Sequence, residues 1–169
     1  MKKGIAFLLT VLMLAAAGCG AKASDHVTDY QVDVPDGFVE TELEGVAACW
    51  TNLADGSSIN VSVARKSSAA DTGFSSITAD TARAALGSAL EDRYGAQAAI
   101  TDRYFTQDAV CGLPAYQYGY DVTVGGRTVA QTVVCVNADR LYTFTYTDMT
   151  GAWAGAFEAS AQNIQLVIE

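Results

Sequence analysis

Histidine is almost absent from this sequence, which has 169 residues and a single histidine, His26. We interpret His26 as a solvated linker residue in a small, polar N-terminal segment, without an acid–base partner. A serine or cysteine nucleophile elsewhere in the chain would therefore lack an imidazole base, and zinc would lack its usual nitrogen ligand. Neither a Gly-x-Ser-x-Gly nucleophile elbow nor a Cys-x-x-Cys pair occurs. Paired carboxylates, such as Asp102 and Asp108, are the remaining route to hydrolysis, although such acids usually lie on the surface. We expect no enzyme, no metal site and no other cofactor.

Basic residues are also scarce, with 10 lysines and arginines against 19 aspartates and glutamates. The formal charge is −9, and without Lys2 and Lys3 it would be −11, because eight basic residues would then face 19 acidic ones. Such a chain is repelled by nucleic acid and by anionic lipid headgroups. We therefore expect no nucleic-acid partner, and any attachment to a membrane must come from a lipid.

The chain has one long apolar run, from Ile5 to Ala17, and it is too short for a stable membrane-spanning helix. It follows Lys2-Lys3 and ends at Gly18-Cys19, the order of a signal peptide. The segment resembles a bacterial lipoprotein signal, with Ala16-Ala17-Gly18-Cys19 in the lipobox position. The usual pattern has leucine where Ala16 stands, and an ordinary secretory signal with an incidental cysteine is the alternative.

The lipoprotein resemblance implies that residues 1–18 are removed and that acyl chains such as palmitate are attached to Cys19. Several acyl chains are sufficient to hold a protein on a bilayer. The predicted organisation is a signal peptide over residues 1–18, a lipidated cysteine and tether over residues 19–29, and one domain over residues 30–169. The expected location is the extracytoplasmic face of the cell membrane.

Three cysteines would remain in the exported domain, where a disulfide can persist. One pair with one cysteine left over is the simplest arrangement. We favour Cys111 with Cys135, because one ends a predicted strand and the other lies in the strands that follow. Cys49 is the alternative partner of Cys135, and three reduced, buried thiols are a further possibility.

Residues 113–146 alternate apolar or aromatic with polar residues, a pattern that predicts three consecutive antiparallel strands. Gly125-Gly126 is a preferred two-residue hairpin turn, and Ala138-Asp139 is the predicted second turn. These two turns would place one set of side chains on a single face: Tyr116, Tyr118, Tyr120, Val133, Tyr142, Phe144 and Tyr146. We interpret this face as core. If it is only partly covered, Tyr116, Tyr118 and Tyr142 would form a contact surface.

The remaining elements follow from periodicity and turn residues. We expect a strand at residues 30–34, a hairpin of 46–52 with 58–65 around Asp55-Gly56, a loop at 66–76 and a strand at 100–110. A helix over residues 78–94, capped by Thr78 or Asp80, would present Ala82, Leu86, Leu90 and Tyr94 to the core. A second helix would follow a Thr150 cap, with Trp153, Phe157 and Ala161 in a core-facing stripe at four-residue spacing. An extended end would follow at residues 166–168.

This order of elements resembles the PsbP/DcrB-like fold, which PsbP-like lipoproteins share. The resemblance rests on residues 30–38, 56–63, 112–116, 141–146 and 157–164, and above all on Gly112-Leu113-Pro114-Ala115-Tyr116 at the entry to a strand. It implies an α+β fold: a single antiparallel sheet of about six to seven strands between a long central helix and a C-terminal helix. It carries no catalytic or metal residue. The function it implies is a non-enzymatic, lipid-anchored envelope protein that serves as an accessory or protein-binding domain for an unknown envelope partner. A small-ligand-binding lipoprotein or an envelope hydrolase is the alternative.

Overall fold

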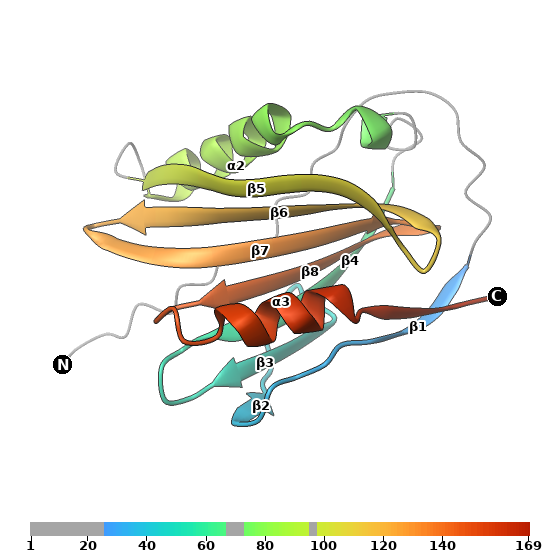
Figure 1. The fold of residues 1–169 in the computed structure, drawn as a ribbon, viewed down its shortest axis with the longest axis horizontal. Helices are drawn as coiled ribbons and strands as arrows, with labels where there is room; N and C mark the ends of the chain where they lie inside the picture. The colour runs from blue at the N-terminus through green and yellow to red at the C-terminus, as the bar shows by residue number, and fades with distance from the viewer. Residues whose placement is uncertain (1–25, 67–72, 95–97) are drawn as a thin grey trace.

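The computed structural model describes residues 26–66, 73–94 and 98–169. These residues form nine strands, two helices and a short 3-10 helix, and Figure 1 shows how they are arranged. No helix in these ranges has the length and apolar character needed to cross a membrane. The elements are, in chain order, β1 (Val27–Gln31), β2 (Phe38–Glu40), β3 (Ala48–Asn52), β4 (Ser58–Arg65), η1 (Phe74–Ser76), α2 (Ala79–Tyr94), β5 (Ala98–Val110), β6 (Leu113–Val124), β7 (Arg127–Asn137), β8 (Arg140–Asp148), α3 (Ala154–Gln162) and β9 (Gln165–Ile168).

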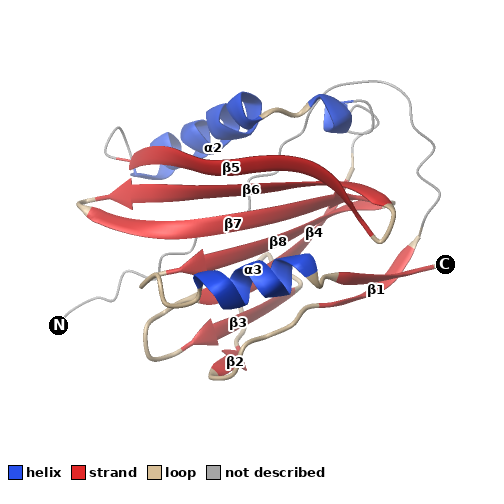
Figure 2. Ribbon diagram, viewed as in Figure 1, coloured by secondary structure: helices blue, strands red, loops and turns tan. Residues whose placement is uncertain are grey.

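Seven strands form one antiparallel sheet in the order β2-β3-β4-β8-β7-β6-β5, and β1 pairs with β9 in a separate two-stranded ribbon. In Figures 1 and 2, α3 crosses in front of β8, and α2 runs along the β5 side of the sheet. The predicted α+β architecture is confirmed. The predicted hairpin around Asp55-Gly56 is also present, as β3 paired with β4.

The predicted turn at Gly125-Gly126 joins β6 to β7 as expected. Both glycines have positive φ, 58° and 79°, which a residue with a side chain adopts only at a cost. The register places Val124 opposite Arg127 and Tyr116 opposite Cys135, as a two-residue turn at Gly125-Gly126 requires.

The predicted turn between β7 and β8 is wrong by one residue. The strands pair Asn137 with Leu141, so three residues rather than two form the turn. Because side chains alternate between the faces of a strand, one extra residue moves every side chain of β8 to the other face. Tyr142, Phe144 and Tyr146 therefore lie on the face opposite Tyr116, and the predicted single aromatic face does not exist.

The sheet consequently has two apolar cores. On one face, α2 packs with Ala82, Leu86 and Leu90 over the tyrosines of β6, which confirms the predicted helical stripe; the side chain of Tyr94 is outside the described residues. On the other face, α3 and the β1–β9 ribbon cover the aromatic residues of β8. The fully buried side chains of this α3-side core include Ile59, Val61, Val136, Phe144 and Tyr146.

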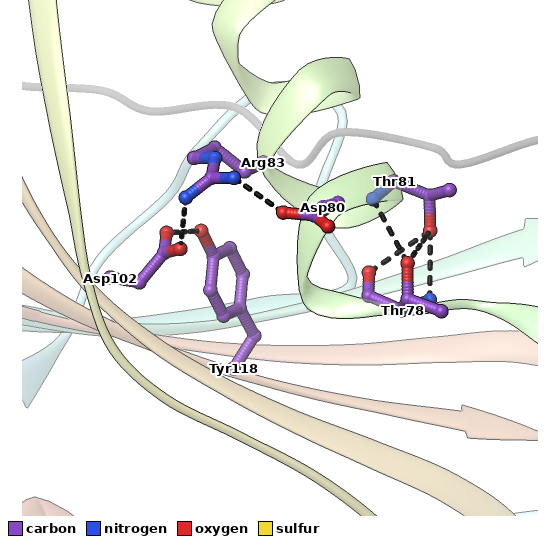
Figure 3. Close-up of polar contacts among 6 residues, drawn as sticks. All are labelled: Thr78, Asp80, Thr81, Arg83, Asp102 and Tyr118. Carbon is purple, nitrogen blue, oxygen red and sulfur yellow. Dashed lines mark hydrogen bonds and ion pairs between the residues drawn. The ribbon is translucent and has the colours of Figure 1, made fainter.

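A reciprocal cap and an ionic network hold α2 in place, and Figure 3 shows both. Thr78 Oγ1 accepts from Thr81 N at 3.3 Å, and Thr81 Oγ1 accepts from Thr78 N at 2.8 Å, so Thr78 caps the helix as predicted. Arg83 then forms ion pairs with Asp80 and with Asp102 of β5. Tyr118 donates to the same Asp102. The pKa of Tyr118 lies far above its ordinary value, mainly because the side chain is buried and secondly because of this hydrogen bond. Tyr118 is therefore a neutral hydrogen-bond donor.

The second helix begins later than predicted and without a Thr150 cap. Its first residue is Ala154, preceded by Trp153, and no side chain caps it directly. Instead Asp148, which is 4% exposed, accepts hydrogen bonds from the backbone N–H groups of Thr150, Gly151 and Trp153. The carboxylate at the end of β8 therefore organises the turn into α3, whose Phe157 and Ala161 enter the core as predicted.

The N-terminal end of the described chain is more ordered than a simple tether. The first strand begins at Val27, earlier than the predicted residue 30. His26, predicted to have no partner, contacts Asp139 of the β7–β8 turn with Nδ1 3.0 Å from Oδ2. Burial acts to raise the pKa of Asp139, but hydrogen bonds from His26 and from Val27 N outweigh it and hold that pKa below its ordinary value.

Candidate functional site

The predicted lipidation site, Cys19, lies outside the described residues. The other three cysteines are free thiols. Cys111, in the β5–β6 turn, accepts from Leu166 N at 3.3 Å, beside the α3-side core. Cys135 lies on the α2 face, 3.6 Å from Thr143 Oγ1, and Cys49 is on β3, which β4 and β8 separate from β7. The sheet thus keeps apart Cys111 and Cys135, and the predicted disulfide, with either partner, is not formed. Burial raises the pKa of Cys135 to about 11, so this thiol is not a nucleophile at neutral pH.

The tyrosines proposed as a contact surface are buried. Tyr116 and Tyr118 are 4% and 3% exposed beneath α2, and Tyr142 is 5% exposed in the α3-side core. The carboxylates proposed as a pair are separated as well. Asp102 is paired with Tyr120, whose side chain lies on the α2 face, and Asp108 with Ala115, whose side chain lies on the other face.

A groove opens where α3 leaves part of its sheet face uncovered. The helix lies along β8, and the neighbouring part of β5 and β7 stays open beside it. The groove has a volume of about 300 Å³, at the lower end of the range for small-ligand sites. Its walls are Arg103, Tyr104, Ala130, Thr132, Tyr146, Asp148, Ala154, Phe157 and Glu158. Two of these, Tyr146 and Phe157, have ring centroids 5.5 Å apart and form an apolar wall. Burial raises the pKa of Tyr146 to about 12, so this wall stays neutral.

A β-bulge shapes the opposite wall. The register of β5 against β6 shifts between Asp102 and Tyr104, which leaves Arg103 unpaired in the ladder. Bulges re-aim side chains and are frequent beside functional sites. Arg103 donates to the Gln131 carbonyl oxygen at 2.9 Å, and its Nε lies 3.3 Å from Asp121 Oδ1. Its guanidinium lies 5.9 Å from the centre of the Tyr104 ring. The bulge therefore brings a cation and an aromatic ring side by side at the groove.

The Tyr104 ring lies directly over Gly119 of β6. A Cβ at Gly119 would lie 2.6 Å from Cζ and 2.8 Å from Cδ1 of that ring. The hydroxyl of Tyr104 lies 3.1 Å from Thr132 Oγ1 and accepts from Gln117 Nε2 at 3.0 Å. An isolated glycine in a strand often marks such a close approach. Gly119 in Tyr118-Gly119-Tyr120 was therefore a signal in the sequence that pointed to this site and was missed.

Replacing Gly119 with alanine is expected to displace the Tyr104 ring and break both of its hydrogen bonds. We expect a loss of about 1–2 kcal/mol in the free energy of unfolding, since small-to-large changes in a packed site cost this much. In the Tyr104→Ala background the added methyl has no ring to meet, so the same change should cost under about 0.5 kcal/mol. Urea unfolding of the unaltered chain, the two single variants and the double variant gives the cost of Gly119→Ala with and without the Tyr104 ring. Equal losses in both backgrounds would show that the ring does not rest on Gly119.

The groove offers binding rather than catalytic chemistry. It combines the cation of Arg103, an aromatic wall on each side, the hydroxyls of Tyr104 and Thr132, and the exposed carboxylate of Glu158. The other carboxylate, Asp148, is already occupied by backbone N–H groups. Within residues 26–66, 73–94 and 98–169 no group of three or more histidine, cysteine, aspartate or glutamate side chains is placed to hold a metal ion. The arrangement suits an amphipathic group that presents an apolar part and a hydrogen-bonding part.

Comparisons with known proteins agree with the fold. A family model described as PsbP matches residues 21–165. The structure is similar to cyanobacterial PsbP (CyanoP) from Synechocystis sp. PCC 6803, with a TM-score of 0.64 and 19% identity over 91% of this chain and 99% of that one. It is also similar to LpqN of Mycobacterium tuberculosis, a protein involved in cell envelope biogenesis, with a TM-score of 0.51 and 13% identity over 88% of this chain and 87% of that one. The search of curated proteins gives no match.

Proposed function

Because this chain belongs to the PsbP family, we propose that it is a non-catalytic accessory domain, held at the extracytoplasmic face of the cell membrane by a lipid on Cys19. The signal-like segment ending at Gly18-Cys19 supports the anchor. The similarity to LpqN, a protein involved in cell envelope biogenesis, supports the envelope location. The strong negative charge is consistent with a domain that a lipid, and not its own surface, brings to the membrane.

The groove between α3 and the bulge of β5 is the proposed working surface, and it is the observation that carries the proposal. Its volume of about 300 Å³ accommodates one or two side chains of a partner segment. Tyr146 and Phe157 would contact the apolar part of that segment. Arg103, whose side chain is 34% exposed, would donate to its polar part. Aromatic and arginine side chains at the centre of a surface commonly contribute most of the binding energy.

Site-specific photocrosslinking in intact cells tests this proposal. Ala154 lines the groove and is exposed, whereas Ala84 is exposed on α2. A photoreactive amino acid at position 154 is expected to give a discrete adduct with an envelope protein, and the same group at position 84 none. Adding Arg103→Ala and Tyr104→Ala should reduce the adduct at least several-fold while the protein level is unchanged.

Two results would contradict the proposal. Identical adducts at positions 154 and 84 would show that the groove has no special role. In the same preparation, the intact mass of the chain reports the anchor. We expect residues 1–18 to be missing and acyl mass on Cys19, and a chain with an intact N-terminus and no added mass would remove the lipid from the proposal.

A further inference from the structure

The described chain begins at the end of the sheet where β7 turns into β8. His26 Nδ1 lies 3.0 Å from Asp139 Oδ2 in that turn, and Val27 N donates to Asp139 Oδ1 at 3.3 Å. Tyr142, near the start of β8, donates to the Val27 carbonyl oxygen at 3.2 Å. These three contacts fix the start of β1 to one end of the sheet, around Asp139, which we name the tether end.

The groove lies at the opposite end of the same strands. Asp148 and Ala130 both line it and are paired with each other, and Asp148 is the last residue of β8. A strand rises about 3.3 Å per residue, so β8 extends about 26 Å from Arg140 to Asp148. Figure 1 shows this separation, with β1 at the right of the view and the start of α3 at the left.

The predicted lipid is close in sequence to the tether end. Seven peptide steps separate Cys19 from His26. A polypeptide extends by at most about 3.6 Å per residue, so the tether end stays within about 25 Å of a lipid on Cys19. The groove, in contrast, lies about 26 Å further along β8, at the end of the sheet to which the tether is not attached.

The charge of the chain favours one orientation above a bilayer. Without residues 1–18 the formal charge is −11, and anionic headgroups repel such a domain. This repulsion is screened beyond about 10 Å at an ionic strength of about 0.1 M. A sheet that lies flat would keep its whole length within that distance, whereas a sheet that stands on its tether end would keep only that end there. Standing on the tether end therefore minimises the repulsion.

We propose that the groove faces away from the bilayer and binds an amphipathic segment in the extracytoplasmic part of an envelope protein, not a lipid headgroup. The side chains alone do not separate these two partners, because arginine binds a phosphate as readily as a peptide oxygen. The place of the groove in the fold does separate them, since headgroups lie at the tether end. This inference rests on the proposed lipid anchor and on the proposed groove, and it adds which kind of partner can reach the groove.

Energy transfer to labelled lipids measures the orientation. The lipidated protein is placed in vesicles of phosphatidylcholine and phosphatidylglycerol whose headgroups carry an acceptor dye. A donor dye is attached through an unnatural amino acid at Ala109 or at Ala154, two exposed alanines. Ala109 lies at the tether end, because its row of the sheet is next to the row that contains Tyr142. We expect transfer from position 154 to be at least several-fold weaker than transfer from position 109.

The other outcomes of this measurement overturn the inference in distinguishable ways. Transfer that is equal at the two positions, or stronger at position 154, would overturn the orientation and leave the anchor in place. The control variant Cys19→Ser should give no transfer from either position. If the unaltered chain behaves like this control, the lipid anchor is missing, and the proposed location fails together with the inference.

The adduct formed at position 154 in intact cells identifies the partner. We expect the crosslinked peptide to come from an extracytoplasmic part of an envelope protein, outside any membrane span of that protein. An adduct with a phospholipid would overturn the inference, even though the groove would still be a working surface. If the transfer difference is present but position 154 gives no adduct, the groove faces outward without a protein occupant, and the proposed partner is wrong.

Discussion

Replacing Phe144 with alanine is expected to lower the free energy of unfolding by about 3–5 kcal/mol, the usual cost of removing a buried phenylalanine. Phe144 is 0% exposed at the centre of β8, and its ring centroid lies 5.9 Å from that of Tyr30. It belongs to the core that α3 and the β1–β9 ribbon cover. Deleting the ring leaves a cavity that α3, β1 and β9 would have to close. Urea unfolding followed by tryptophan fluorescence measures the loss.

Leu53 provides the matched control for this prediction. It is a large apolar residue that is 75% exposed in the β3–β4 turn, so Leu53→Ala should change the free energy of unfolding by less than about 0.5 kcal/mol. Limited proteolysis adds a second readout. In the Phe144→Ala protein, cleavage in α3 should increase more than cleavage in α2, because only α3 packs on the Phe144 face. A Phe144→Ala protein as stable as Leu53→Ala would place this ring outside the core.

The position of Phe144 shows what alternation predicts and what it leaves open. The pattern of β8 correctly groups Tyr142, Phe144 and Tyr146 on one face, because side chains alternate along a strand. It does not say which face of the sheet that is. The number of residues in the turn decides, and the β7–β8 turn lacks the Gly-Gly signal that fixes β6 against β7. Ala138-Asp139-Arg140 has no such feature. The assumption of a two-residue turn therefore assigned the side chains of β8 to the wrong face of the sheet.

The groove was harder to predict, because it depends on contacts between distant parts of the chain. It needs a bulge at Arg103, and nothing in the alternation of residues 98–110 marks one. It also needs α3 to leave part of the sheet uncovered, which the helical stripe alone does not determine. The contact of His26 with Asp139 joins residues 113 positions apart, and no local pattern reveals such a pair. Gly119 was the one local sign of the groove in the sequence, because glycine is unfavourable in a strand interior and often marks a close approach of another group.

The second large effect is expected at Asp148, where Asp148→Ala should lower the free energy of unfolding by about 3 kcal/mol or more. Hydrogen bonds to an ionised group contribute about 1.5–3 kcal/mol each and are not additive. Asp148 accepts from Gly151 N at 2.7 Å and from Thr150 N and Trp153 N at 3.0 Å each. Alanine leaves these three backbone donors without their carboxylate in the turn that sets the direction of α3. Urea unfolding measures the loss, and crosslinking from Ala154 should fall with it, because α3 forms one wall of the groove.

Two further variants distinguish the contribution of the turn to stability from the contribution of negative charge in the groove. Asp148→Asn keeps one acceptor oxygen, so it should lose about half as much stability as Asp148→Ala. Glu158→Gln removes the exposed carboxylate of the same groove and should cost less than about 0.5 kcal/mol. If Asp148→Ala were no more destabilising than Glu158→Gln, the backbone donors would have found water instead. The direction of α3, and with it the shape of the groove, would then depend on the packing of Phe157 and Ala161 alone.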